Sequence, residues 1–188
     1  MPDFGKLFAG FFRLVAQGQI EIYNEFSLQH ELGIYLRTVI GADYKIQFEL
    51  PAPFFGIERF GLEKKEMDIS VFDHDLSSKY AIELKYPRNG RHPETMFDFC
   101  KDIRFLEQLA AGGFLRCYFV AVVDDPLFYE GRETTGIYQY FRSDKPIQGV
   151  IEKPTGKKTC ALEIAGSYKV EWQPLKAAAK YFLVEIGC

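Results

Sequence analysis

The stretch YAIELKYPRNGRH (residues 80–92) places two charged residues inside a segment that otherwise has the composition of a buried strand. Because side chains alternate along a strand, Ala81, Glu83 and Lys85 share one face, and the two charged residues lie about 6.6 Å apart. The opposite face carries only apolar and aromatic side chains, those of Ile82, Leu84 and Tyr86. The strand ends at Pro87, and its charged face needs an explanation.

Two more strands are predicted before this stretch. Residues 44–50 (YKIQFEL) alternate apolar and polar positions up to Pro51, and residues 63–73 (EKKEMDISVFD) alternate again. In the second of these strands the alternation separates apolar from polar side chains: Met67, Ile69 and Val71 against Asp68 and Ser70. The short connection that follows favours antiparallel pairing with residues 80–86.

Helices are predicted on either side of these three strands. Apolar residues recur at helical spacing in residues 24–41, with Asn24 or Ser27 as the cap and Gly41 as the stop, and again in residues 93–111. Residues 116–125 (RCYFVAVVDD) are apolar and β-branched in the middle, which is typical of a buried central strand. The element order from residue 24 to residue 125 is therefore αβββαβ.

The C-terminal third has a weaker pattern. Residues 126–159 have no sustained period and predict a long functional loop with a short helix. Residues 160–172 (CALEIAGSYKVEW) predict an extra C-terminal hairpin that turns at Gly166 and Ser167. Residues 180–186 (KYFLVEI) predict a last strand, although the preceding LKAAAK also suits a helix.

Length and composition indicate one α/β domain covering residues 1–188, with a mixed central sheet flanked by helices. The hydrophobic fraction of 47% is enough for a core, and the formal charge of −3 gives no chain-wide attraction to nucleic acid or membrane. The apolar N-terminal segment contains Arg13 and lacks a cleavage signature, so we expect a short packing helix there. Four scattered cysteines predict reduced thiols in the cytoplasm.

Asp68, Glu83 and Lys85 form the candidate catalytic group. Antiparallel pairing of the second and third strands would place Asp68 beside Glu83. Two carboxylates suit Mg²⁺, which prefers oxygen ligands and is often held by only one or two protein carboxylates. Such a cation polarises a phosphodiester and helps to make hydroxide, while Lys85 orients the water or stabilises negative charge on the phosphate. These residues predict phosphodiester hydrolysis, with Asp68 and Glu83 as metal ligands.

The order of elements and these residues resemble the PD-(D/E)XK nuclease superfamily. Its core runs αβββαβ, and its motif is an acid on the second strand followed by Glu-X-Lys on the third. Here the motif is Asp68 and then Glu83-Leu84-Lys85, and EMD stands where PD would. The resemblance implies a restriction endonuclease-like fold and Mg²⁺-dependent cleavage of DNA, with Mn²⁺ as a substitute, in restriction, repair or defence. Many members add a glutamate from the first helix, and Glu31 is the matching position as an auxiliary metal ligand.

A local basic cluster follows the motif. Arg88 and Arg91 lie directly beyond the third strand, and Lys101 and Arg104 lie on the helix after it. Lysine and arginine side chains hold nucleic-acid backbones by their phosphates, so we expect these four residues to contact DNA. A solvated turn and a charged outer helix face are the alternatives. A homodimer would let so small a nuclease cut both strands.

Other functions are compatible with the same residues. Glu83 and Lys85 alone would make only a surface ion pair worth at most about 1 kcal/mol. A chain that keeps the nuclease fold without the reaction would be a nucleic-acid or protein-binding module, and a metal-dependent hydrolase of another phosphate ester is a third reading. The sequence has no GxSxG elbow, Walker loop, HExxH motif or Rossmann glycine fingerprint, so the enzymes built on these motifs are excluded.

Overall fold

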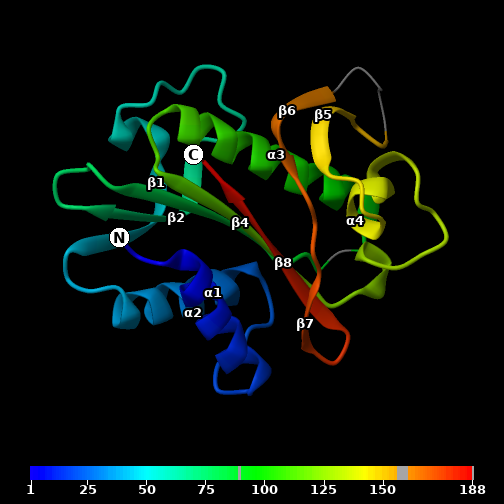
Figure 1. Cartoon of the computed structure of the whole chain (residues 1–188), viewed down its shortest axis with the longest axis horizontal. Coiled ribbons are helices and arrows are strands. Elements are labelled where there is room, and N and C mark those ends of the chain that lie inside the picture. Colours follow the sequence, from blue (N-terminus) through cyan, green and yellow to red (C-terminus); the bar gives the residue numbers. More distant parts are fainter. Residues whose placement is uncertain (89, 156–160, 188) are drawn as a thin grey trace.

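A computed structural model describes residues 1–88, 90–155 and 161–187 and has a mixed six-stranded sheet between two layers (Figure 1). The strand order is β1-β2-β3-β4-β8-β7; only the β3–β4 pair is parallel. The helices are α1 (Phe4–Ala16), α2 (Glu25–Val39), α3 (His92–Ala111) and α4 (Gln139–Arg142), with short 3₁₀ turns at Ala52–Phe55, Pro126–Phe128 and Gly136–Tyr138. The strands are β1 (Tyr44–Pro51), β2 (Glu66–Asp73), β3 (Lys79–Lys85), β4 (Arg116–Val123), β5 (Ile147–Glu152), β6 (Ala161–Tyr168), β7 (Gln173–Lys176) and β8 (Ala179–Ile186).

The predicted order αβββαβ is observed from α2 to β4. Asn24 caps α2: its side chain accepts a hydrogen bond from the Ser27 N–H, and the Ser27 hydroxyl in turn accepts from the Asn24 N–H. β4 is buried along most of its length and lies between β3 and β8, as its apolar sequence predicted. The mixed α/β architecture with a mixed sheet flanked by helices is therefore confirmed.

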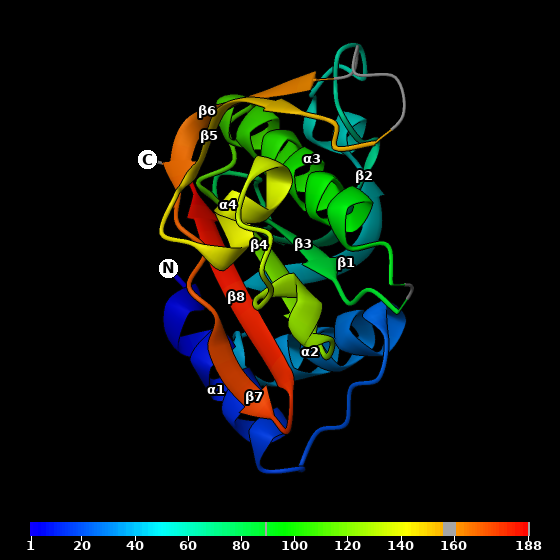
Figure 2. The ribbon, with the colours of Figure 1, turned by 90° about the vertical axis from the view of Figure 1, so that its right-hand side faces the viewer.

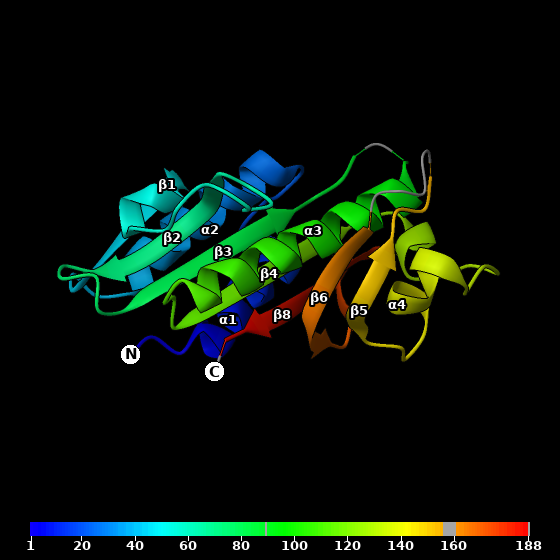
Figure 3. The same ribbon diagram turned by 90° about the horizontal axis from the view of Figure 1, so that it is seen from above.

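Each face of the sheet has its own core. α1 and α2 cover one face, and α3 covers the other together with the separate β5–β6 sheet (Figures 2 and 3). The expected N-terminal packing helix is α1, which buries four phenylalanines: Phe4, Phe8, Phe11 and Phe12. No helix in the described ranges is both long and apolar enough to cross a membrane. Cys100 and Cys117 are buried free thiols; Cys160 and Cys188 lie outside the described residues.

The side-chain alternation of β2 changes at Asp68, which corrects one prediction. Ile69 and Val71 pack in the α2-side core as expected, but Met67 packs in the α3-side core. Beside this position β1 is irregular, since Glu49 has a φ of 51°. The Asp68 carboxylate reaches across to the backbone of β3, where it accepts a hydrogen bond from the Leu84 N–H.

The predicted turn at Gly166 and Ser167 is wrong. β6 continues through this position with a bulge-like shift of register and pairs with β5, a strand that the sequence pattern did not indicate. Glu107 on α3 accepts hydrogen bonds from the N–H groups of Ala165 and Gly166 at 3.1 and 2.7 Å, which fixes this part of β6 to the helix. The C-terminal hairpin is formed instead by β7 and β8, so LKAAAK contains the end of β7, the turn and the start of β8 rather than a helix. The predicted long loop contains α4 and β5, and its residues 156–159 lie outside the described ranges.

Candidate functional site

The candidate site lies where β2 and β3 meet at the end of their pairing. The antiparallel register aligns Ile69 with Ile82, so Asp68 and Glu83 are the next two residues of the same ladder. The Glu83 carboxylate lies 3.4 Å from the Asp68 N–H, which donates to it, and the Asp68 carboxylate accepts from the Leu84 N–H at 2.7 Å. The sequence prediction that Asp68 and Glu83 lie side by side is confirmed.

A lysine that the sequence analysis did not consider lies between these acids. Lys64, in the loop of residues 56–65, donates a hydrogen bond to Glu83 through its Nζ. The same Nζ lies 3.6 Å from Asp68 Oδ1 and 3.4 Å from Asp102 Oδ1. An ammonium group therefore occupies the space around which the three carboxylates converge.

Lys85 lies on the other side of Asp102. Its Nζ is 3.2 Å from Asp102 Oδ2 and 3.4 Å from Glu25 Oε1, and it also donates to the Leu84 carbonyl at 3.2 Å. Glu25 accepts a further hydrogen bond from the Tyr86 N–H at 3.3 Å, which joins the first turn of α2 to the end of β3. Asp102, which lies on α3, thus bridges Lys64 and Lys85.

Six side chains form this charge cluster: Glu25, Lys64, Asp68, Glu83, Lys85 and Asp102. With every group ionised, its four carboxylates and two ammonium groups have a formal charge of −2. Glu83 is fully buried, and Asp102 is nearly so. The Glu25 side chain is 46% exposed, so solvent screens part of this excess; the buried part is costly unless a proton or a cation balances it.

The pKa shifts reflect this excess. Burial, reinforced by the carboxylates of Asp68 and Asp102, raises the pKa of Glu83 well above its ordinary value. Burial also raises the pKa of Asp102, against the opposing influence of the two lysines. Burial alone would lower the pKa of Lys64 and of Lys85, but the surrounding carboxylates outweigh it and raise both. Both lysines are therefore charged at neutral pH.

A small pocket of about 280 Å³ leads to the cluster from the α2 side. Its lining combines three carboxylates with an exposed aromatic ring: Glu25, Phe26, Gln29, Glu49, Asp68 and Leu84. Gln29 holds this wall together, because its side-chain amide donates to Glu49 at 2.6 Å and to the Asp68 carbonyl at 2.7 Å. The mouth of the site is acidic, so a phosphate could approach it only with a cation in between.

The position expected of Glu31 is corrected by the structure. Glu31 contacts its neighbour His30 at 3.5 Å, and its side chain is 34% exposed. The buried stripe of α2 contains Leu28, Leu32 and Leu36, and Glu25 extends that stripe at i−3 from Leu28. Glu25 and Glu31 are six positions apart in the sequence, so the two point about 120° apart around the helix axis. Glu25, rather than Glu31, is the α2 glutamate of the charge cluster.

Asp102 could have been found from sequence, whereas Lys64 could not. Asp102 follows Phe99 by three residues and precedes Leu106 by four, so it lies on the apolar stripe of its helix, where a carboxylate needs a partner. Lys64 lies in an irregular loop with no periodic signal. Only the folded loop brings its ammonium to the acids.

Three of the four basic residues predicted to contact DNA are paired with acids. Arg88 pairs with Asp124, Lys101 with Asp98 at 2.7 Å, and Arg104 with Glu107 at 3.2 Å. Arg91 is exposed, and the described residues offer it no ion-pair partner within 4.0 Å. The DNA contact of these four residues stays a prediction, with Arg91 the most available of them.

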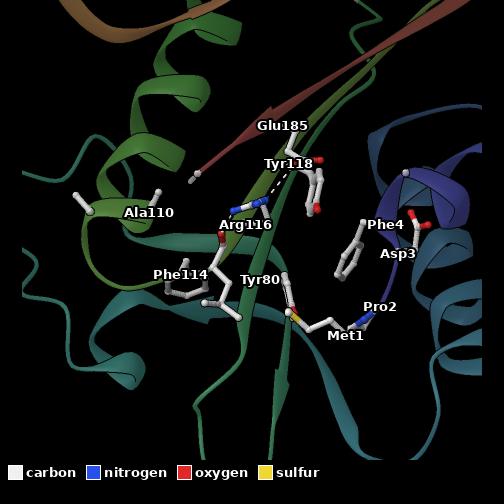
Figure 4. Close-up of a pocket in the computed structure, with 14 residues that line it drawn as sticks. Met1, Pro2, Asp3, Phe4, Tyr80, Ala110, Phe114, Arg116, Tyr118 and Glu185 are labelled. Carbon is white, nitrogen blue, oxygen red and sulfur yellow. Dashed lines mark hydrogen bonds and ion pairs between the residues drawn. The ribbon is translucent and has the colours of Figure 1, made fainter.

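A second, larger pocket lies at the opposite end of β3 (Figure 4). It has a volume of about 720 Å³, and Phe4, Tyr80 and Tyr118 supply aromatic walls. Arg116 and Glu185 form an ion pair there at 2.9 Å. Tyr80 precedes Lys85 by five residues, about 16 Å along an extended strand, so this pocket is separate from the charge cluster.

Within residues 1–88, 90–155 and 161–187, no three His, Cys, Asp or Glu residues are arranged as they would be around a metal ion. Asp68, Glu83 and Asp102 instead each pair with the Lys64 ammonium. Comparisons of the chain with protein-family models, with curated proteins and with solved structures found no match. The site must therefore be interpreted from its own chemistry.

Proposed function

We propose that the protein is a Mg²⁺-dependent nuclease of the PD-(D/E)XK type, acting on DNA. The observation that carries the proposal is the charge cluster at the junction of β2 and β3, with its formal excess of two negative charges. A single divalent cation would neutralise that excess. The order αβββαβ, with Asp68 on the second strand and Glu83 and Lys85 on the third, supports the same assignment.

The donor set fits a hard cation in its chemistry. Asp68 and Glu83 would hold the ion through carboxylate oxygens, the ligands that Mg²⁺ and Mn²⁺ prefer. Oδ2 of Asp102 is buried and lies 3.2 Å from the Lys85 Nζ, so this carboxylate is held between the two lysines beside the proposed ion position. When bound, the ion would polarise the phosphodiester and lower the pKa of a coordinated water.

The surroundings of Lys85 define its role in this proposal. Asp102 and Glu25 raise the pKa of Lys85 against the effect of burial, which favours a charged ammonium at this position. A fixed ammonium beside the site stabilises the negative charge that grows on the phosphate during hydrolysis. Glu25 and Asp102 are positioning residues, because they hold the lysine from α2 and α3.

The rival function is a non-catalytic nucleic-acid or protein-binding module. One observation favours it: Lys64 already pairs with Glu83, and an internal counter-ion can stabilise a fold that binds no metal. In that case the cluster is a structural network, and the surface rather than the site carries the function.

Metal-dependent cleavage separates the two functions. The full chain is incubated with Mg²⁺ or Mn²⁺ and with single-stranded, duplex or branched DNA. Asp68→Asn and Lys85→Ala should each lower the cleavage rate by about 10²-fold or more, because they remove a metal ligand and a charge stabiliser. Lys65→Ala, at an exposed neighbouring position, should match the wild type.

Two results would contradict the proposal. A folded wild type that takes up no metal in calorimetry and cuts none of these substrates would favour the binding module. Equal cleavage by the wild type and Lys85→Ala would remove Lys85 from the mechanism and assign the activity to another site.

A further inference from the structure

The Lys64 ammonium occupies the space that a metal ion would need. It donates to Glu83 and lies 3.6 Å from Asp68 Oδ1, and these are the two carboxylates proposed to hold Mg²⁺. An ammonium and a divalent cation repel each other and compete for the same oxygens. Lys64 and a metal ion therefore cannot both occupy this position.

The loop that carries Lys64 is tied to α3 by one glutamine. The Gln108 side chain donates to the Gly61 carbonyl at 2.8 Å and accepts from the Glu63 N–H at 2.9 Å. Lys64 follows Glu63 directly, so these two hydrogen bonds set the point from which its side chain enters the cluster. The Lys64 side chain is 28% exposed, which gives it a path out towards solvent.

We propose that Lys64 is a built-in counter-cation that closes the metal site and must withdraw from Glu83 and Asp68 before a divalent ion can bind. The inference rests on the proposed metal site. In the metal-free protein the ammonium supplies part of the missing positive charge, so the closed arrangement is the stable one. The apparent affinity for metal is then reduced by the small fraction of molecules in which Lys64 has withdrawn. The loop of residues 56–65 thereby sets the metal concentration at which the site loads.

The test measures Mn²⁺ binding to the full chain by calorimetry and needs no cleavage assay. Lys64→Met keeps the apolar stem and removes the charge, and it should tighten Mn²⁺ binding by about tenfold or more. Lys65→Met removes an equal charge from an exposed neighbour and should leave the Kd within about twofold of the wild type. Gln108→Ala releases the loop without altering the cluster, and it should tighten binding by about two- to fivefold.

The outcomes distinguish failure of this inference from failure of the proposed function. Equal Kd values for the wild type, Lys64→Met and Gln108→Ala would overturn the role of Lys64 and leave the metal site standing. No Mn²⁺ uptake by any folded variant would overturn the metal site and this inference together. If circular dichroism shows that Lys64→Met does not fold, Gln108→Ala decides: tighter binding supports the inference, and an unchanged Kd overturns it.

Discussion

Replacing Lys64 with methionine should destabilise the metal-free protein, and the loss should grow as the pH rises. The substitution removes the ammonium that neutralises Glu83, Asp102 and Asp68. Removing one partner of a buried ion pair costs about 3–5 kcal/mol. Because the Lys64 side chain is 28% exposed, we expect the lower end of that range, about 3 kcal/mol at pH 8. In a domain of this size that loss lowers the melting temperature by about 6–12 °C.

The pH dependence comes from Glu83, which faces Lys64, Asp68 and Asp102. Its pKa in the folded protein is raised above the ordinary value of 4.5, and loss of Lys64 raises it further. A raised folded-state pKa contributes stability that is fully present below pH 4.5 and is lost as the pH rises through the folded-state value. The raised pKa favours a protonated Glu83 at pH 5, so the variant should lose less stability there than at pH 8. The difference from the wild type can grow by at most about 1.4 kcal/mol per pH unit.

Urea denaturation in EDTA at pH 5, 6.5 and 8 measures this effect. Lys65→Met is the matched control, and its free energy of unfolding should stay within about 0.5 kcal/mol of the wild type. The reasoning is refuted if Lys64→Met loses the same stability at pH 5 and pH 8. It is equally refuted if the two methionine variants behave alike, because Lys64 would then not be the counter-ion of the buried carboxylates.

Two further pairs of substitutions test how α2 is placed. Glu25→Gln should lower the rate of Mg²⁺-dependent DNA cleavage by about tenfold, because Lys85 loses a charged partner. Glu31→Gln should leave this rate unchanged. Equal rates for the two variants would contradict the assignment of Glu25 as the α2 glutamate of the charge cluster. Gly33→Ala should destabilise the protein by about 1–3 kcal/mol, because its new Cβ would overlap an aromatic ring of β1. A Cβ added at Gly41 meets nothing within 4 Å, so Gly41→Ala should stabilise the protein by up to about 1 kcal/mol. Thermal denaturation compares the melting temperatures of the two variants.

The C-terminal third shows where prediction from sequence stopped. Gly166 and Ser167 have the composition of a turn, but the strand continues because Glu107, nearly sixty residues earlier, accepts its backbone N–H groups. β5 was missed for a related reason: only three of its six residues are apolar, and only Ile147 and Ile151 among them are buried, so no alternation marks it. Local composition does not reveal a hydrogen-bond or strand partner that is distant in the sequence, and that partner decides which backbone conformation forms.

The spacing of apolar side chains in residues 24–125 was sufficient to predict the helices, the strands and their order, because the residues that one face of a helix or strand buries recur with the period of that element. It also predicted that Asp68 and Glu83 adjoin, since antiparallel pairing across a short connection leaves little choice of register. Lys85, on the same strand as Glu83, was also predicted. The other three members, Glu25, Lys64 and Asp102, come from α2, an irregular loop and α3, and no spacing relates them along the chain. Electrostatic interactions depend on distance in space, so the counter-ion of the buried acids became known only when the chain was folded.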